Sequence, residues 1–326
     1  MIKTLSVGQA SYDIYVQVDE FPQENTKSRF INKIGCGGGS ACTISYLLAK
    51  WGVGSTFAGT IGNDMYGNRI QKELENIGVD TRYIETTFDK DTSVSFVIVN
   101  TKTGTRTLFN YADEYVKLRK FDFDFQPDII VVDGHDLYAS KSTIERFPKA
   151  ITVCDASRYA NDVVEAAKLC QYIICSQEFA ESITKFKIDF NNSATLVSVY
   201  DALRKKFDHQ NIIITLWEKG AWYQIENQIK ISPALNVKPL DISGASDVFN
   251  GAFVYALTQS YNVEQAVRFS NIAAGLSTQV VGARLSIPKL ADVQKIYDEK
   301  ASWSIYSIST SFRFAWWNSW ISNIYD

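Results

Sequence analysis

The segment D241-I-S-G-A-S-D-V-F-N-G251 stands directly before the apolar, helix-like run A-F-V-Y-A-L. Backbone N–H groups at a helix start are unpaired, and the helix dipole makes that end electropositive. The small residues Gly244, Ala245 and Ser246 would let an anion approach these groups, and Asp247 could take a proton from a hydroxyl beside it. Phosphoryl transfer to an alcohol needs such a base next to an anion site. On this segment alone the alternative stays open that Asp247 only caps the helix and Gly244 marks a turn.

The composition sets limits on the class of protein. The chain has 326 residues, 46% of them hydrophobic, which is enough for one large domain or a domain with a small addition. A net charge of −3 and a pI of about 5.6 point to no general nucleic-acid-binding or membrane-binding surface. The five cysteines form no Cys-x-x-Cys pair, and the N-terminus does not have the pattern of a signal peptide. We therefore expect a cytoplasmic protein.

Strand-like and helix-like segments alternate along the chain. Short β-rich runs are found at 4–8, 128–134, 151–155, 172–176 and 211–216. Helical patterns lie at 41–51, 66–78, 162–170 and 197–207, with Gly52 and Gly78 at expected C-terminal stops. The strand runs carry few polar residues, as do parallel strands that are covered on both faces. This alternation predicts a doubly wound α/β fold, with a mostly parallel sheet and helices on both faces.

Two segments depart from this rhythm. Residues 12–34 and 92–111 alternate polar and apolar side chains, as strands with one buried face do, and T-K-T-G at 101–104 is typical of a hairpin turn. They predict a small antiparallel sheet that projects from the core as a lid, or an extension of the main sheet's edge. Lid-to-lid dimerisation would use its outer face.

The last 26 residues, 301–326, form a separate tail. They contain four of the seven tryptophans and seven serines, and their polar residues are too frequent for a membrane span. We place the main domain at 1–300 and assign the tail no function.

A second small-residue segment supports the phosphoryl-transfer interpretation. Residues 35–43 read G-C-G-G-G-S-A-C-T and lead into a helical pattern that ends at Trp51-Gly52. Such a glycine turn lets a ligand approach the backbone closely. It does not match the register of a dinucleotide-binding fingerprint, which makes a dehydrogenase a distant alternative.

Taken together, these motifs resemble the ribokinase-like (PfkB) family of carbohydrate and nucleoside kinases over roughly residues 3–297. The similar segments are G38-G-S-A-C-T43, I-G-N-D-M-Y-G at 61–67, D241-I-S-G-A-S-D247 and V-G-A-R-L-S-I-P at 281–288. The resemblance implies a doubly wound domain with a β-lid and an ATP-dependent phosphotransferase. It also implies Mg²⁺ and a K⁺-type ion as cofactors.

The resemblance also assigns expected roles to single residues. It implies that Asp247 is the catalytic base and that Gly244, Ala245 and Ser246 form the anion hole. The sugar would contact Asp13, Gly38, Gly39 and Thr43. The nucleotide would lie against Thr215, Trp217, Gly220, Asn271 and Gly282. The monovalent ion would lie at Asp241, Ser243 and Ser286.

Several residues depart from the family pattern. Ser246 replaces a glycine, at a cost on the order of 1 kcal/mol if its φ is positive and at little cost if it is helical. Thr43 replaces an asparagine, Trp217 replaces a glycine in the nucleotide loop, and S176-Q-E-F179 replaces Asn-x-x-Glu at the magnesium-water position, where Glu178 or Glu181 could substitute.

The sequence therefore predicts a PfkB-type kinase that uses ATP to phosphorylate a sugar or a sugar-like alcohol. A nucleoside kinase of the same fold and a degenerate, non-catalytic binding protein remain as alternatives. Which sugar is used lies beyond the sequence.

Overall fold

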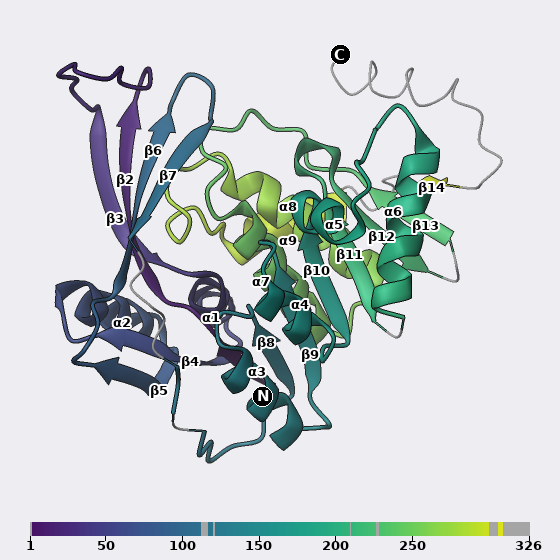
Figure 1. Cartoon of the computed structure of the whole chain (residues 1–326), viewed down its shortest axis with the longest axis horizontal. Helices are drawn as coiled ribbons and strands as arrows, with labels where there is room; N and C mark the ends of the chain where they lie inside the picture. The colour runs from purple at the N-terminus through teal and green to yellow at the C-terminus, as the bar shows by residue number, and fades with distance from the viewer. Residues whose placement is uncertain are drawn as a thin grey trace.

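A long, twisted β-sheet runs through the centre of the molecule (Figure 1). The computed structural model describes residues 2–111, 117–119, 121–208, 210–225, 228–299 and 306–308. Within them the strand order of this sheet is β14-β13-β12-β11-β10-β9-β8-β1-β4-β5. The parallel strands are β1 (Lys3–Val7), β4 (Gly54–Gly62), β5 (Asp80–Thr87), β8 (Ile129–Val132), β9 (Ile151–Ala156), β10 (Tyr172–Ser176) and β11 (Asn211–Thr215). Three antiparallel strands complete one edge: β12 (Ala221–Ile225), β13 (Gln228–Ser232) and β14 (Tyr306–Ile308).

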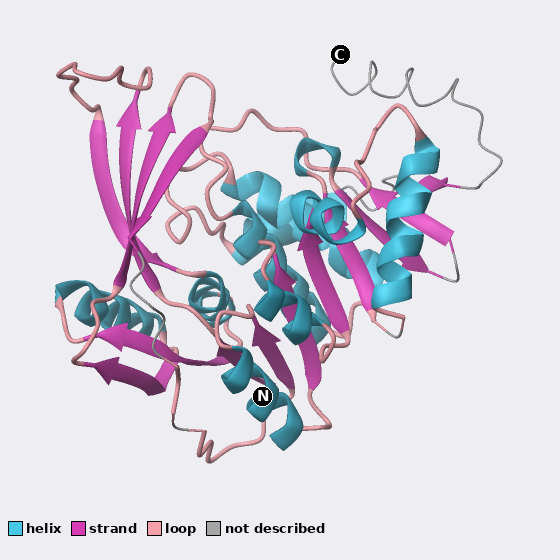
Figure 2. Ribbon diagram, viewed as in Figure 1, coloured by secondary structure: helices cyan, strands magenta, loops and turns pink. Residues whose placement is uncertain are grey.

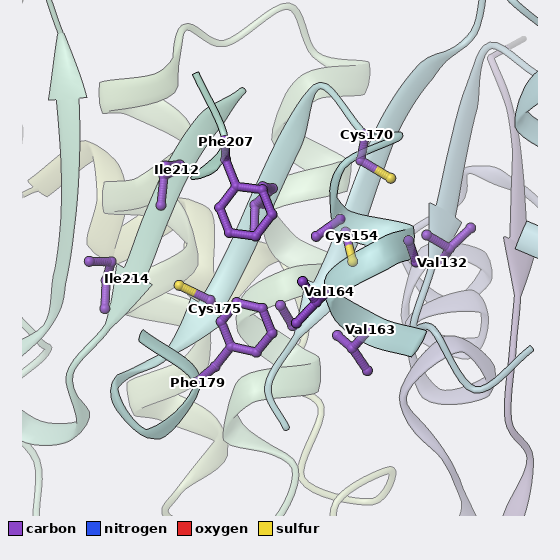
Figure 3. Close-up of a cluster of buried hydrophobic side chains, with 14 of the residues drawn as sticks. Val132, Cys154, Val163, Val164, Cys170, Cys175, Phe179, Phe207, Ile212 and Ile214 are labelled. Carbon is purple, nitrogen blue, oxygen red and sulfur yellow. The ribbon is translucent and has the colours of Figure 1, made fainter. Parts of the chain in front are cut away.

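Helices cover both faces of the sheet (Figure 2). The apolar cluster on one face includes α1 (Ser40–Lys50), α7 (Ala245–Thr258), α8 (Val263–Ser277) and α9 (Leu290–Glu299), and α2 (Met65–Ile77) packs beside α1. The opposite face carries α3 (Leu137–Arg146), α4 (Asn161–Ala167), α5 (Gln177–Thr184) and α6 (Ser193–Lys206). Figure 3 shows part of this second cluster, where Val163 and Val164 of α4 and Phe179 of α5 pack near Cys154 and Cys175 of the strands. The predicted doubly wound fold is confirmed.

Local sequence explains where these elements begin and end. All four residues of β8 are buried, since helices cover it on both sides. Helix α2 begins after Asp64, whose carboxylate accepts hydrogen bonds from the N–H groups of Tyr66 and Gly67. It buries Ile70 and Leu74 on one side and ends at Gly78, whose φ of 93° is left-handed.

A second sheet projects from the main domain (Figure 1), and it has four strands. Its order is β3 (Asn32–Gly38), β2 (Ser11–Val18), β6 (Ser93–Asn100) and β7 (Arg106–Tyr111). The two segments predicted to form the lid therefore lie in one sheet, and 101–104 lies in the hairpin between β6 and β7 as predicted. Two of the pairings are antiparallel, whereas the central β2–β6 pairing is parallel. We refer to this sheet as the lid.

Of the tail at 301–326, only 306–308 lies within the described residues. These residues form β14, which pairs with β13 at the edge of the main sheet. Within the described part of the chain, no helix combines the length and hydrophobicity needed to cross a bilayer.

Candidate active site

The start of α7 forms the centre of the candidate active site. Gly244 precedes the helix with a left-handed φ of 74°, and a side chain at this position would overlap Ala283 of the 281–288 loop. Glycine is therefore required here both by the backbone conformation and by the packing. Ser246 lies inside the first helical turn, so its replacement of a glycine carries little backbone cost. Within the described residues, the N–H groups of Ser246 and Asp247 make no hydrogen bond, which leaves them available to an anion.

Asp247 lies in the same first turn and is only partly exposed. Burial, the nearby carboxyl of Asp155 and that of Asp13 raise its pKa to about 7, although Ser40 and Arg106 favour the ionised form. Ser40, at the start of α1, is close enough to Asp247 to favour the ionised form of its side chain. A carboxyl with a pKa near neutrality can both take up and release a proton at physiological pH, as a general base must.

The side of the site that was predicted to bind the acceptor is formed by the lid strand β2 and the glycine-rich strand β3. Asp13 is 9% exposed and receives hydrogen bonds from the hydroxyls of Ser11 (3.0 Å) and Tyr15 (3.3 Å). Burial raises its pKa, against the effects of Ser11, Ser95, Arg284 and Tyr15. A side chain at Gly38 would overlap the Asp13 carboxylate, so the glycine is what allows the acid to lie here. The structure therefore brings Asp13 and Gly38 together, as the sequence predicted.

Two further residues of the predicted sugar site lie at the start of α1. Gly39 is its N-cap residue, and its carbonyl accepts a hydrogen bond from the N–H of Thr43. The Thr43 side chain is fully buried, and its hydroxyl has no hydrogen-bond partner among the described residues. A direct contact between Thr43 and a substrate stays a prediction.

The strand register of the lid places an arginine on the same face as Asp13. Asp13 of β2 pairs with Ser95 of β6. Val99 lies on the same side of β6 as Ser95, and Val99 pairs with Arg106 of β7. Arg106 is half-buried, and its charge acts on Asp247. Its buried Nη1 has no hydrogen-bond partner within the ranges that the structure describes. The lid therefore presents the carboxyl group of Asp13 and the positively charged guanidinium of Arg106 toward the start of α7.

The residues predicted to hold a monovalent ion surround the buried Asp241. Its two carboxylate oxygens accept hydrogen bonds from the N–H groups of Ser243 and Gly282, both at 2.9 Å. The buried Ser243 hydroxyl has no hydrogen-bond partner in the described part of the chain, whereas that of Ser286 donates to the Ala283 carbonyl. No lysine or arginine among the described residues forms an ion pair with Asp241. A buried carboxylate beside an unpaired hydroxyl oxygen fits a monovalent cation.

Four of the predicted nucleotide residues lie in or beside the turn between β11 and β12, whereas Gly282 lies against Asp241. Gly220 lies against Ser232, and the Asn271 side chain donates to the backbone carbonyl (2.9 Å) and hydroxyl (3.0 Å) of the same serine. Thr215 ends β11, and its hydroxyl donates to the Cys175 carbonyl at 3.3 Å. Trp217 follows in a short 3₁₀ turn (η1, Trp217–Lys219) with a φ of 54°, and it is 65% exposed. Trp217 thus has a backbone conformation that glycine adopts more easily, with its indole largely in solvent.

The segment expected to organise magnesium-bound water has local structural roles. The Ser176 hydroxyl caps α5 by accepting the Phe179 N–H at 3.0 Å, and Phe179 is buried in the core. Glu181 pairs with Lys187 at 2.6 Å and accepts the Ile188 N–H, whereas Glu178 is exposed. Among the described residues, no group of three or more His, Cys, Asp or Glu side chains could hold a metal ion.

Four residues of the site were not singled out from the sequence: Ser40, Asp155, Arg106 and Tyr15. Ser40 directly follows Gly38-Gly39 at a helix start, and Asp155 lies one residue before the end of the buried strand β9, so both carried a positional signal. Arg106 could have been found by following the alternation of β7. No local pattern indicated that the Tyr15 hydroxyl would link Asp13 to the Ala283 N–H at 3.0 Å.

A doubly wound sheet, a β-lid and a helix start that holds a carboxylate beside N–H groups without a partner among the described residues are features of a small-molecule kinase. Residues 1–290 match the profile of the pfkB family of carbohydrate kinases. Ribokinase from Staphylococcus aureus (strain COL) is 24% identical over 311 residues, which cover 90% of this chain and 99% of that protein. The chain belongs to the pfkB family of carbohydrate kinases.

Solved structures agree with this assignment at the level of the fold. Ribokinase from Thermotoga maritima is 26% identical, with a TM-score of 0.76 and coverage of 91% of this chain and 100% of that one. Ribokinase from Arabidopsis thaliana, solved in complex with ribose and ATP, is 20% identical with a TM-score of 0.75. That match covers 91% of this chain and 99% of the other.

Proposed function

We propose that this protein transfers the γ-phosphoryl group of ATP to a hydroxyl of a sugar, with Asp247 as the base. The observation that carries the proposal is the position of Asp247 in the first turn of α7, with a pKa of about 7, next to unpaired N–H groups. A sugar is favoured as acceptor because Asp13, held by hydroxyl groups on the inner face of the lid, can accept hydrogen bonds from sugar hydroxyls.

The reaction follows from these positions. Asp247 takes the proton of the acceptor hydroxyl as the new bond forms between the acceptor oxygen and the γ-phosphorus. The bond from that phosphorus to the bridging oxygen breaks, and ADP keeps the electron pair. The N–H groups at the start of α7 and the Arg106 guanidinium stabilise the charge on the transferred group. The lid excludes water, which limits hydrolysis of ATP.

Two cations complete the proposal. Asp241, Ser243 and Ser286 would hold a potassium-type ion, which would neutralise the buried carboxylate next to the anion turn. Mg²⁺ commonly binds through substrate phosphates and only one or two carboxylates, so it would arrive with the nucleotide. Mg²⁺ would shield the charge of the phosphates during transfer.

The outer face of the lid supports a homodimer. Phe96 pairs directly with Phe109 on this face, and they are 47% and 58% exposed. Phe109 belongs to the edge strand β7, and exposed aromatic side chains at such an edge are a common site of association between chains. We propose that two copies associate through this face.

The five buried, free cysteines support a reducing compartment such as the cytoplasm.

The test is a screen of aldoses, ketoses and nucleosides for phosphorylation by ATP, followed by kinetics of Asp247→Asn on the best acceptor. The variant should lose a factor of about 10²–10⁴ in kcat, while ATP binding stays unchanged. Asp162→Asn is the matched control, because Asp162 is an exposed acid in the first turn of α4. Turnover near that of wild type in Asp247→Asn would exclude the proposed base. Transfer to nucleosides alone would replace the sugar by a nucleoside acceptor.

A further inference from the structure

A buried arginine links the two halves of the site. Arg284 belongs to the 281–288 loop, is 2% exposed, and extends behind β3 toward α1 and α2. Its Nη1 pairs with the Glu73 carboxylate of α2 at 2.9 Å, and its Nη2 donates to the Cys42 Sγ of α1 at 3.0 Å. The guanidinium lies 5.0 Å from the centre of the Tyr46 ring. The loop is thereby fixed to two helices of the acceptor side.

The same ion pair also contacts the glycine strand. The Glu73 carboxylate accepts the N–H of Gly37 at 2.9 Å, and a side chain at Gly37 would overlap the Arg284 guanidinium. β3 is an edge strand of the lid, so a side chain supplies this backbone hydrogen bond on its outer edge. The next residue, Gly38, lies against Asp13. The position of the pair therefore determines how β3 meets the acid of the acceptor pocket.

The loop carrying Arg284 also contacts the phosphate side. Its Ala283 lies against Gly244 of the anion turn and donates its N–H to Tyr15, which in turn hydrogen-bonds Asp13. Arg284 thus stands between the turn that would receive the phosphoryl group and the strand that would receive the acceptor.

The Arg284–Glu73 pair is better explained by a positioning role than by a contribution to stability. Burying an ion pair gives little net stability, because the desolvation of both groups offsets their attraction. We propose that Arg284, through Glu73, is a positioning residue that holds the glycine strand β3 against Asp13 and so sets the affinity for the acceptor. The inference rests on the proposed kinase function.

The surroundings indicate which variant can be tested. A cavity of about 290 Å³ opens beside the pair, with Glu73, Asn76, Tyr46 and Arg284 in its wall, and the Glu73 side chain is 30% exposed. If Arg284 is replaced by Met, Glu73 can turn toward solvent, so the fold should survive. Glu73→Gln would instead leave Arg284 buried without its counter-charge, which is costly.

The experiment compares Arg284→Met with wild type in two measurements. In steady-state kinetics the KM for the acceptor should rise about tenfold or more, while the KM for ATP changes less than twofold. Arg69→Met is the matched control. Arg69 also lies between α2 and the lid, where it contacts Tyr12, but it forms no hydrogen bond or ion pair with β3 among the described residues. The control should keep both constants.

The second measurement does not depend on activity. Backbone amide exchange of the free protein should become faster at 34–38 and 281–286 in Arg284→Met and stay unchanged in β8. Unchanged exchange at 34–38, or an unchanged KM for the acceptor in a folded variant, would overturn the positioning role. If wild type phosphorylates no acceptor but exchange responds as expected, the kinase proposal fails and the structural role of Arg284 stands.

Discussion

The raised pKa of Asp247 leads to a sharp expectation for the pH dependence of activity. The base must be ionised to accept a proton, and its pKa is about 7 where 3.8 is ordinary for an aspartate. At pH 5 only about 1% of Asp247 would be ionised, against about 94% for an ordinary aspartate. The plot of kcat/KM against pH should therefore fall about tenfold per unit below pH 7.

Two substitutions should move this acidic limb in opposite directions. Asp155 raises the pKa of Asp247, so Asp155→Asn should move the limb to lower pH. Arg106 lowers it, so Arg106→Gln should move the limb to higher pH. The assay is kcat/KM for the acceptor between pH 5 and 9 at constant ionic strength and saturating ATP. An activity that stays flat down to pH 5, or two variants that move the limb in the same direction, would refute the reasoning.

The raised pKa of Asp247 should make activity rise with pH, but it should make the stability of the fold fall with pH. Because the folded protein holds the proton of Asp247 up to about pH 7, its contribution to stability is complete below pH 3.8 and is lost as the pH rises through 7. Asp247→Asn should therefore unfold at a higher temperature than wild type at pH 8, in contrast to the loss of kcat expected for the same variant. Calorimetry at pH 8 checks this prediction. A lower Tm for Asp247→Asn than for wild type would contradict the conclusion that the buried charge of Asp247 destabilises the fold.

Three further predictions concern the nucleotide loop, the cation site and the lid. Trp217→Gly should change the free energy of unfolding by less than about 1 kcal/mol, because relief of left-handed strain and the greater flexibility of the unfolded chain nearly cancel. The same variant should weaken ATP binding about 5- to 150-fold if the exposed indole stacks on the nucleotide, as titration followed by fluorescence would show, and tighter binding would contradict this role. Asp241→Asn should abolish stimulation of kcat by KCl, measured against a matched sodium series, with a smaller loss than Asp247→Asn. Unchanged stimulation would exclude this site. Phe109→Glu should give monomers in sedimentation velocity, whereas Phe88→Glu, on an 82% exposed side chain outside the lid, should not; dimers in both variants would place the interface elsewhere.

The sequence was most informative where structure depends on neighbouring residues. The unbroken apolar run of β8, the helix stop at Gly78 and the alternation in 92–111 each predicted an element that the fold contains, because periodicity and turn chemistry are local properties. The order of the glycine and aspartate motifs predicted the family, and it placed Asp13 beside Gly38 and Gly244 at the start of α7.

What only the tertiary structure decided depends on residues far apart in the chain. The backbone is helical at Ser246 and left-handed at Trp217 because of the way their loops close. The type of a residue alone does not determine its φ. The pKa of Asp247 is set first by burial and then by charges that include Asp155, Asp13 and Arg106, which come from three different strands. Arg284 reaches Glu73 across 211 positions of sequence. Sequence pattern records the periodicity of each element, whereas electrostatic and packing interactions depend on distances that exist only after the sheets and helices have assembled.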